Sequence, residues 1–475
     1  MSLSTPSAAS RWPAQIKYII GNEACERFSY YGMRSILAGY ITGAVLKGGL
    51  GQTDDQATEI VHLFVFVNYF MPLLGAWISD KLIGRYHTIL WVSLFYCAGH
   101  GVLACSDMAG TVHGKMVLLC TGLGLIAFGS GGIKPCVSAF MGDQFKPEQS
   151  HLLQKAYGAF YWSINLGSFF AFLVIPWFKN HYGYGIAFGV PGILMAIATF
   201  IFWLGTKHYV RVPTSRETKN AGFFQVIFTT LFTPRTPGQA GFWAKARTRF
   251  SDQEVDAARS VLPILFVFAL VPVFWSLFDQ TNTTWVLQGE KMVPASILGF
   301  SIGAEEMQSA NPAIVMILVP LLTLLVYPVI GKFAAPLRRM AYGMFLASAS
   351  YLIVAALQKQ IEAGVQLSVL WQGVPYVVLT LAEVLISTTG LEFAFREAAP
   401  EMKSSIMSFW LLTVAFGDLL VAVLTKILAS ATNSSASVST DRFMLYAGLT
   451  FVVAILFSLA ATTYRYRDTA AAQGK

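Results

Sequence analysis

The chain has 475 residues, of which 55% are hydrophobic and only 12% are charged, whereas soluble domains carry about 25% charged residues. Together with a mean hydropathy of +0.57, this composition excludes an ordinary soluble domain and predicts an integral membrane protein. The formal net charge is +8, and the positions of the basic residues predict which loops face the cytoplasm.

Twelve apolar stretches are each long enough to cross a bilayer as a helix, which takes about 20 residues. Six precede a polar segment and six follow it. We therefore expect an N-terminal six-helix bundle within 1–205, a linker at 206–259 and a C-terminal six-helix bundle within 260–475. The predicted spans are 14–45, 57–80, 86–106, 115–140, 153–178, 184–205, 260–278, 312–335, 341–357, 371–391, 404–429 and 442–464.

The linker at 206–259 holds nine Lys or Arg residues and four acidic ones. Basic loops stay in the cytoplasm, so we expect the linker there, and twelve spans place both termini on the same side. Membrane topology thus accounts for the positive charge, and a nucleic-acid partner has no basis. Within the linker, the apolar run from Phe223 to Phe232 predicts an amphipathic helix that lies on the membrane or on the bundle.

Charged residues gather on the first predicted helix, where lipid disfavours them. At 100° per residue, Glu23, Arg27 and Arg34 share one face with Tyr30, and Glu26 lies beside it. An ionised side chain at bilayer depth costs about 2.5–3.5 kcal/mol or more, so such residues face a protein interior or a water-filled cavity and mark ion or substrate pathways. The first helix therefore predicts a transporter.

Three more polar residues lie within predicted spans. Glu383 lies too deep in 371–391 for its short side chain to reach the interface, which indicates function. Lys134 lies toward one end of 115–140, so its side chain either serves function or extends to the interface. His62 has a near-neutral intrinsic pKa that suits a proton relay, with a buried histidine bonded to a neighbour as the alternative.

Several motifs resemble one transporter family. The loop from Gly75 to Arg85 resembles the loop of glycines, aspartate and basic residues that follows the second helix of the major facilitator superfamily. The segment Glu23-Ala-Cys-Glu26-Arg27-Phe28-Ser-Tyr30-Tyr31-Gly32 resembles the E-x-x-E-R-F-x-Y-Y-G signature of the proton-coupled oligopeptide transporters, a branch of that superfamily. Further segments similar to that family are 132–135, 160–168, 274–280, 311–312 and 382–391.

The resemblance implies roles for individual residues. Arg27 and Lys134 would meet the carboxylate of a peptide, and Glu383, with Asn165 and Asn311, would meet its amino terminus. A zwitterion independently requires such a basic and an acidic pole. The proton-coupling residues implied are Glu23, Glu26, Arg27, Lys134, Glu383 and His62, and the aromatic walls are Tyr31, Tyr69, Tyr161, Trp275 and Trp410.

The first and seventh spans both run outward from the cytoplasm, so Arg34 and Asp279 lie toward the outside, one in each bundle. The family resemblance also implies such a pair there. We therefore expect these residues to form an outer gate through a partly hydrated and breakable salt bridge. Prolines 312, 328 and 375 predict kinks, because proline removes a helical hydrogen bond. Bacterial relatives often carry two extra helices between the halves, and animal relatives carry a large extracellular domain before the tenth helix. Neither fits here, so the minimal all-α plan of twelve helices in a major facilitator fold remains.

The expected function is proton-driven uptake of di- and tripeptides by alternating access, in the plasma membrane, or the inner membrane of a bacterium. No cofactor besides protons and no covalent chemistry is expected, and a monomer would suffice. One alternative is the same fold with another cargo, such as nitrate, an amino acid or a peptide-like compound. Another is a membrane sensor that does not transport, although such a protein would not need the proton-handling carboxylates.

Overall fold

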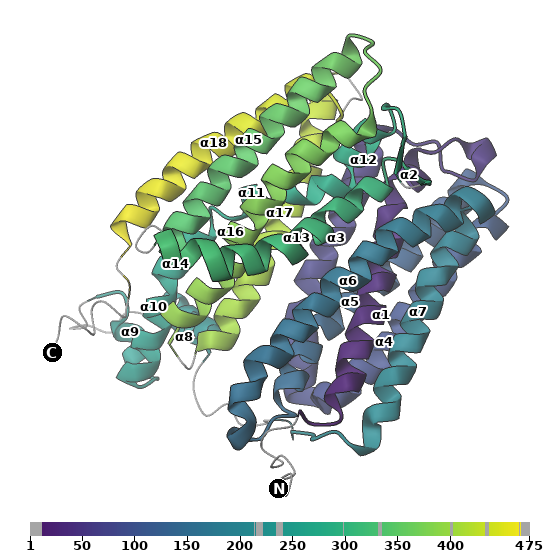
Figure 1. The fold of residues 1–475 in the computed structure, drawn as a ribbon. Coiled ribbons are helices and arrows are strands. Elements are labelled where there is room, and N and C mark those ends of the chain that lie inside the picture. The colour runs from purple at the N-terminus through teal and green to yellow at the C-terminus, as the bar shows by residue number, and fades with distance from the viewer. Residues whose placement is uncertain are drawn as a thin grey trace, which may run out of the picture.

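The computed structural model describes residues 12–212, 214, 222–233, 241–297, 299–330, 335–399, 402–432, 437–464 and 466. These residues form two helical bundles that stand side by side, with the N-terminal half in purple to blue and the C-terminal half in green to yellow (Figure 1). Each bundle has its own hydrophobic core, and the first of these cores consists of residues between Ile16 and Tyr209.

The N-terminal bundle contains α1 (Ile16–Ser35), α2 (Leu37–Thr42), α3 (Asp54–Trp77), α4 (Gly84–Ala104), α5 (Val112–Gly142), α6 (Ser150–Tyr182) and α7 (Tyr184–Leu204). The linker contains α8 (Phe223–Phe232) and α9 (Ala244–Arg247). The C-terminal bundle contains α10 (Asp252–Phe268), α11 (Pro272–Phe278), α12 (Thr284–Gly289), α13 (Ala310–Leu321), α14 (Tyr327–Ile330), α15 (Pro336–Glu362), α16 (Gly373–Glu397), α17 (Lys403–Thr432) and α18 (Thr440–Thr463).

Short elements connect these helices. Strands β1 (Ala295–Ile297) and β2 (Phe300–Ile302) form an antiparallel hairpin in which Ala295 pairs with Ile302. Two π-helical segments, η3 (Ile78–Ile83) and η9 (Leu322–Val326), follow α3 and α13. The 3-10 helices are η2 (Val45–Lys47), η4 (Cys105–Met108), η5 (Pro147–Gln149), η6 (Gly205–Lys207), η7 (Asp279–Asn282), η8 (Glu306–Ser309) and η11 (Val369–Gln372).

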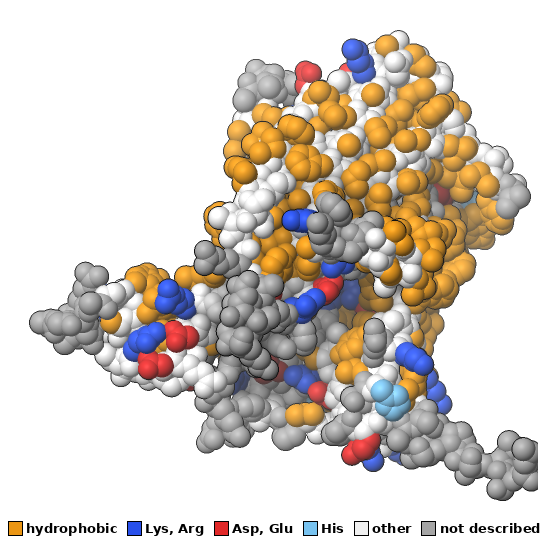
Figure 2. Space-filling view, turned by 60° about the vertical axis from the view of Figure 1, so that its left-hand side comes forward, with side chains coloured by type: hydrophobic (Ala, Val, Ile, Leu, Met, Phe, Trp, Pro, Cys, Tyr) orange, Lys and Arg blue, Asp and Glu red, His pale blue; other side chains and the backbone are white. Residues whose placement is uncertain are grey.

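The described helices make twelve passes. Nine helical stretches are long and apolar enough to cross a membrane, and α10 with α11 adds a tenth that is bent by 42°. The stretch Asp54–Met108 holds two passes, because the chain reverses at Gly84, whose φ is +80°. The first pass is α1, whose charged residues lower its hydropathy. Figure 2 shows hydrophobic side chains over the upper half of the molecule, while most of the charged side chains in view lie in its lower half and in the lobe at the left.

Glycines 129, 131 and 132 let α5 approach its neighbours closely. A Cβ added to Gly129 would lie 2.5 Å from the Cβ of Tyr96 on α4, and one on Gly131 would lie 2.5 Å from the Cβ of Met71 on α3. A Cβ on Gly75 would lie 2.2 Å from the carbonyl oxygen of Gly132. These contacts leave Lys134, two residues further along α5, between packed helices.

Local sequence signals explain several helix boundaries. A capping box of Ser251 and Glu254 starts α10 at Asp252, earlier than the predicted span at 260. The predicted kinks at prolines 312 and 375 are wrong, because both prolines fall in the first turn of an α-helix, where proline is tolerated. Pro328 lies in the short helix α14, and the irregular segment of this pass is the π-helical η9 after Pro320.

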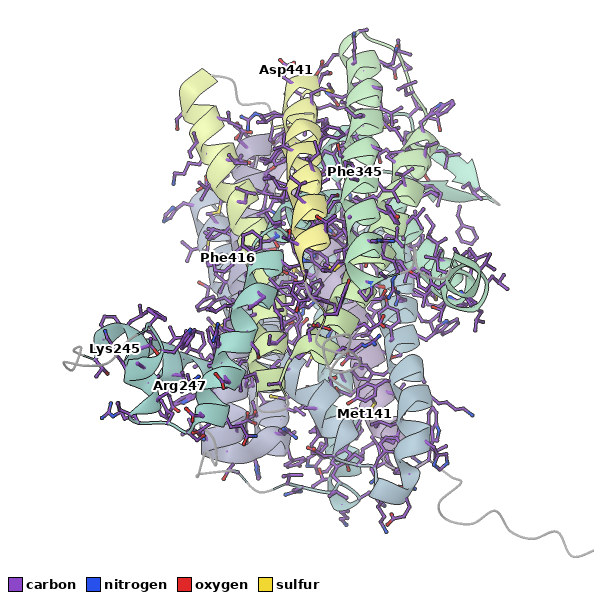
Figure 3. All side chains as sticks on the ribbon, turned by 90° about the vertical axis from the view of Figure 1, so that its left-hand side faces the viewer. Met141, Lys245, Arg247, Phe345, Phe416 and Asp441 are labelled. Carbon is purple, nitrogen blue, oxygen red and sulfur yellow. The ribbon has the colours of Figure 1, made fainter. Side chains whose placement is uncertain are left out.

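The linker packs on the C-terminal bundle. Phe223 and Phe224 of α8 contact the ring of Phe409 on α17 at 5.3 and 5.6 Å between centroids. Lys245 and Arg247 lie in the lobe formed by α8 and α9, which projects from the side of the bundle (Figure 3). The run from Phe223 to Phe232 therefore forms the predicted helix, and one of its faces rests on the bundle.

We call the end of the molecule opposite the N-terminus the distal end. It contains the connections α1–α3, α4–α5 and α6–α7, the hairpin, and the connections α15–α16 and α17–α18. The two bundles approach each other there (Figure 1).

Candidate functional site

A cavity of about 160 Å³ lies between the two bundles. Both halves of the chain contribute to its wall, as expected for a site near the middle of such a pair of bundles. The polar and aromatic residues predicted from the sequence that line it are Tyr31, Arg34, Tyr69, Tyr161, Asn165, Trp275, Asp279, Asn311 and Glu383.

The acidic pole of the cavity is Glu383 on α16. Asn311, at the start of α13, donates a hydrogen bond from Nδ2 to Glu383 Oε2 at 2.7 Å and another to Thr380 Oγ1 at 3.1 Å. Asn165 on α6 lines the cavity from the N-terminal bundle and donates to the carbonyl oxygen of Tyr161. The amide of Asn311 thus fixes the orientation of the carboxylate within the wall.

The basic residues of the N-terminal bundle lie behind the wall. Arg27 Nε is 2.6 Å from Glu23 Oε1 and 3.2 Å from Glu26 Oε2, and its side chain is 13% exposed. The two glutamates therefore hold the guanidinium. Arg27 is not among the residues that line the cavity, so the predicted direct contact with a ligand carboxylate would require this trio to rearrange.

Lys134 is buried between aromatic rings. Its Nζ lies 4.2 Å from the ring centroid of Tyr30 and 4.4 Å from that of Tyr69, and it has no hydrogen-bond partner among the described residues. The alternative that this side chain extends to the interface is wrong, because Nζ points into the protein. Tyr69 lines the cavity, so Lys134 is one side chain removed from it.

The aromatic walls differ from the prediction at one position. Tyr31, Tyr69, Tyr161 and Trp275 line the cavity. Trp410 does not, because it packs behind Trp275 at 6.3 Å between ring centroids and against Phe268 at 5.3 Å. Its indole occupies the space beside Gly390, where an added Cβ would lie 2.1 Å from it.

Arg34 and Asp279 meet as predicted. Arg34 Nη2 lies 2.7 Å from Asp279 Oδ1, and this bond joins α1 to η7 across the two bundles. The expected partial hydration is wrong, since the two side chains are only 3% and 5% exposed. The closed distal end covers the Arg34–Asp279 pair. Separation of these two residues therefore exposes two charges that are otherwise buried.

Asp418 was not among the residues predicted from the sequence. His62 Nδ1 lies 2.6 Å from Asp418 Oδ1 on α17, and His62 Nε2 lies 2.9 Å from Thr283 Oγ1. Both members of the His62–Asp418 pair are fully buried. Asp418 is a single acid within the apolar span 404–429, which is the same signal that pointed to Glu383, so the pattern was sufficient to find it.

Further contacts close the distal end around this centre. Lys179 Nζ lies 2.5 Å from Glu305 Oε2, and Gln308 donates to the carbonyl oxygen of Ser35 at 3.1 Å. Glu305 precedes the span that begins at Glu306, and burial raises its pKa to about 7, although Lys179 acts to lower it. Other distal contacts between the bundles are Asp54–Lys291 at 3.5 Å, Glu59–Lys426 at 3.4 Å and Thr58–Ser437 at 3.2 Å.

No cluster of three or more His, Cys, Asp and Glu side chains that could hold a metal ion occurs among the residues that the structure describes. Two charged pairs of the site, Arg34–Asp279 and His62–Asp418, join the bundles. Such an arrangement suits the movement of protons and of a charged solute.

Comparisons with known proteins agree on one family. The family model described as the POT family matches residues 86–442. The chain is 35% identical to peptide transporter 3 of Caenorhabditis elegans, over 74% of this chain and 51% of that protein. It is 34% identical to solute carrier family 15 member 2 of Mus musculus, over 81% and 54%. The chain spans about half the length of these curated relatives.

Solved structures match along nearly their whole length. A crystal structure of an auto-inhibited POT family peptide transporter is 39% identical, with a TM-score of 0.85 and coverage of 95% of this chain and 98% of that one. The POT family transporter PepTSo is also 39% identical, with a TM-score of 0.86 and coverage of 96% and 99%. Both bundles are therefore included in the match.

Proposed function

The chain belongs to the POT family, and from that premise we propose that it carries di- and tripeptides across the membrane together with protons. The twelve-helix major facilitator fold expected from the sequence is confirmed. In such folds a site between the two bundles opens alternately to each side. Transport of this kind requires no covalent chemistry and no cofactor other than the proton.

The observation that carries the proposal is Glu383 in the wall of the central cavity, opposite an N-terminal bundle whose interior holds Arg27 and Lys134. A carboxylate held by Asn311 attracts an ammonium group, and the opposite bundle supplies positive charge for a carboxylate. A zwitterionic peptide has both groups. A carrier of nitrate would gain nothing from Glu383.

Movement of the basic residues completes this site. Arg27 is held by Glu23 and Glu26, and Lys134 has no hydrogen-bonded partner among the described residues. Protonation of one glutamate weakens its hold on Arg27 and frees positive charge for the peptide carboxylate. Proton binding and peptide binding would thus favour each other, which is the thermodynamic requirement for coupled transport.

We assign the distal end to the outside of the plasma membrane. The linker and both termini then lie in the cytoplasm, in agreement with the basic residues of the linker. Contacts between the bundles, including Arg34–Asp279 and His62–Asp418, hold the distal end closed. The conformation described here is therefore closed to the outside, and Arg34 with Asp279 acts as the outer gate.

Purified protein in liposomes with an imposed inward proton gradient tests this function. Labelled dialanine should accumulate, while labelled alanine and nitrate should not. Accumulation of nitrate or alanine instead of dialanine would favour the alternative cargoes. Accumulation of none of the three would contradict the transporter proposal.

A further inference from the structure

The distal gate contains one more negative charge than its arginine neutralises. Arg34 pairs with Asp279, and Asp418 pairs with His62. Asp418 is also close enough to Arg34 and Asp279 for their charges to act on it. If His62 is neutral, the buried group carries one positive and two negative charges. A buried charge without compensation is strongly unfavourable, so this closed arrangement requires one additional positive charge.

The geometry indicates where a proton would be held. Oδ2 of Asp279 and Oδ2 of Asp418 are both buried without a hydrogen-bond partner among the described residues. Asp279 is close enough to Asp418 for their charges to act on each other. Two ionised carboxylates repel each other in such a buried position, and a proton bound by the cluster relieves this repulsion. The proton would also turn one carboxylate into a hydrogen-bond donor and balance the charge of the cluster.

The remaining charged groups around Asp418 do not replace this proton. On α1, Arg34 already bonds Asp279. On α5, Lys134 acts on Asp418 through its charge, but Lys134 and Arg27 together already balance the two carboxylates of Glu23 and Glu26. On α3, His62 faces Asp418 directly. Tyr30 of α1 also interacts electrostatically with Asp418 and Asp279. Thr283 provides a neutral hydroxyl on the far side of the imidazole.

We propose that Asp418 is a proton-holding residue of the outer gate, and that closure of the distal end binds one proton in the cluster of His62, Asp418 and Asp279. When the bundles separate, water replaces the lost contacts and the two carboxylates can both ionise. The closed state therefore holds one more proton here than the open state. Acidic conditions outside favour closure, and alkaline conditions favour opening.

This inference rests on the proposed transport function only to explain why the gate would bind a proton. The test of the gate itself uses neither peptide nor a proton gradient. Spin labels at Met108 and Lys359, on the distal ends of the two bundles, report their separation in a variant with the five native cysteines replaced. The logarithm of the closed-to-open ratio is measured against pH. Its slope gives the number of protons bound on closure.

Asp418→Asn should reduce this slope by about one proton relative to the unsubstituted protein and keep the gate closed at alkaline pH, because asparagine removes the extra negative charge. Any titration of Glu305 is common to both proteins. Asp54→Asn is the matched control. It breaks the contact with Lys291, so it should lower the closed fraction without changing the slope.

If Asp418→Asn lowers the closed fraction and leaves the slope unchanged, Asp418 is only a structural contact and the proposal is wrong. If the asparagine variant is not obtained folded, Asp418→Ser makes the same test. Because labels report the gate directly, loss of peptide uptake alone would concern the proposed function and not the proton count of the gate.

Discussion

Asn311 Nδ2 lies 2.7 Å from Glu383 Oε2, and this hydrogen bond ties α13 to α16 in the wall of the central cavity. The amide also donates to Thr380 Oγ1 on the same helix. Asn311 therefore presents the carboxylate in one orientation instead of leaving it to bond a basic residue. A fixed acid in a cavity between two bundles is suited to bind the amino terminus of a peptide.

Replacing Glu383 with glutamine should weaken binding of peptides with a free amino terminus by about ten- to a hundred-fold, because a charge-assisted contact contributes roughly 1.5–3 kcal/mol. An N-acetylated peptide of the same sequence should lose far less. Equilibrium binding to purified protein measures both. An equal loss for the two peptides would show that Glu383 does not recognise the amino terminus.

Lys134→Ala should abolish accumulation of peptide against a gradient, since it removes the buried ammonium between the rings of Tyr30 and Tyr69. Exchange of labelled for unlabelled peptide at equal concentrations is the control, because it needs a folded site but no proton coupling. We expect exchange to persist. Full accumulation by the variant would exclude Lys134 from coupling.

Arg34→Ala should impair proton-driven uptake, because it leaves Asp279 buried without its partner. Removing one member of a buried ion pair costs about 3–5 kcal/mol, more than the loss expected for a hydrated pair. The exchange Arg34→Asp with Asp279→Arg should restore part of the uptake. If the exchange is worse than either single change, or if cysteines at 34 and 279 never crosslink, this pair is not the gate.

The pKa of Glu305, raised to about 7 mainly by burial, predicts a second pH effect at the distal end. In the open state the exposed carboxyl returns to about 4.3, so the closed state binds more protons between these values. Its contribution to closure is complete below about pH 4.3 and disappears as the pH rises through about 7. Distal distances should show a smaller pH dependence in Glu305→Gln, and an unchanged dependence would contradict this assignment.

The sequence predicted the helices and the gate because both depend on patterns along the chain. Apolar length identifies a span, and Arg34 and Asp279 were assigned to the same end by counting spans and by family resemblance. Their burial was not predictable, since it depends on how the two bundles close. Trp410 was placed in the cavity wall by the family resemblance, which does not reveal that Trp275 stands in front of it.

Asp418 shows a different limit. Its position in an apolar span was visible, but its partner His62 is 356 residues away in the chain and lies in the other bundle. Lys134 was ambiguous for the same reason, because the direction of a long side chain depends on its neighbours. Only the packed structure places its Nζ over two tyrosine rings.

The coupled movement of peptide and protons is tested most directly by driving protons with peptide. Liposomes containing the protein and an internal pH-sensitive dye are clamped at zero membrane potential, with equal pH on both sides, and dialanine is added outside. The proposed mechanism predicts that the interior acidifies as dialanine enters, and that N-acetylated dialanine has little effect. Entry of dialanine with no change in internal pH would contradict it.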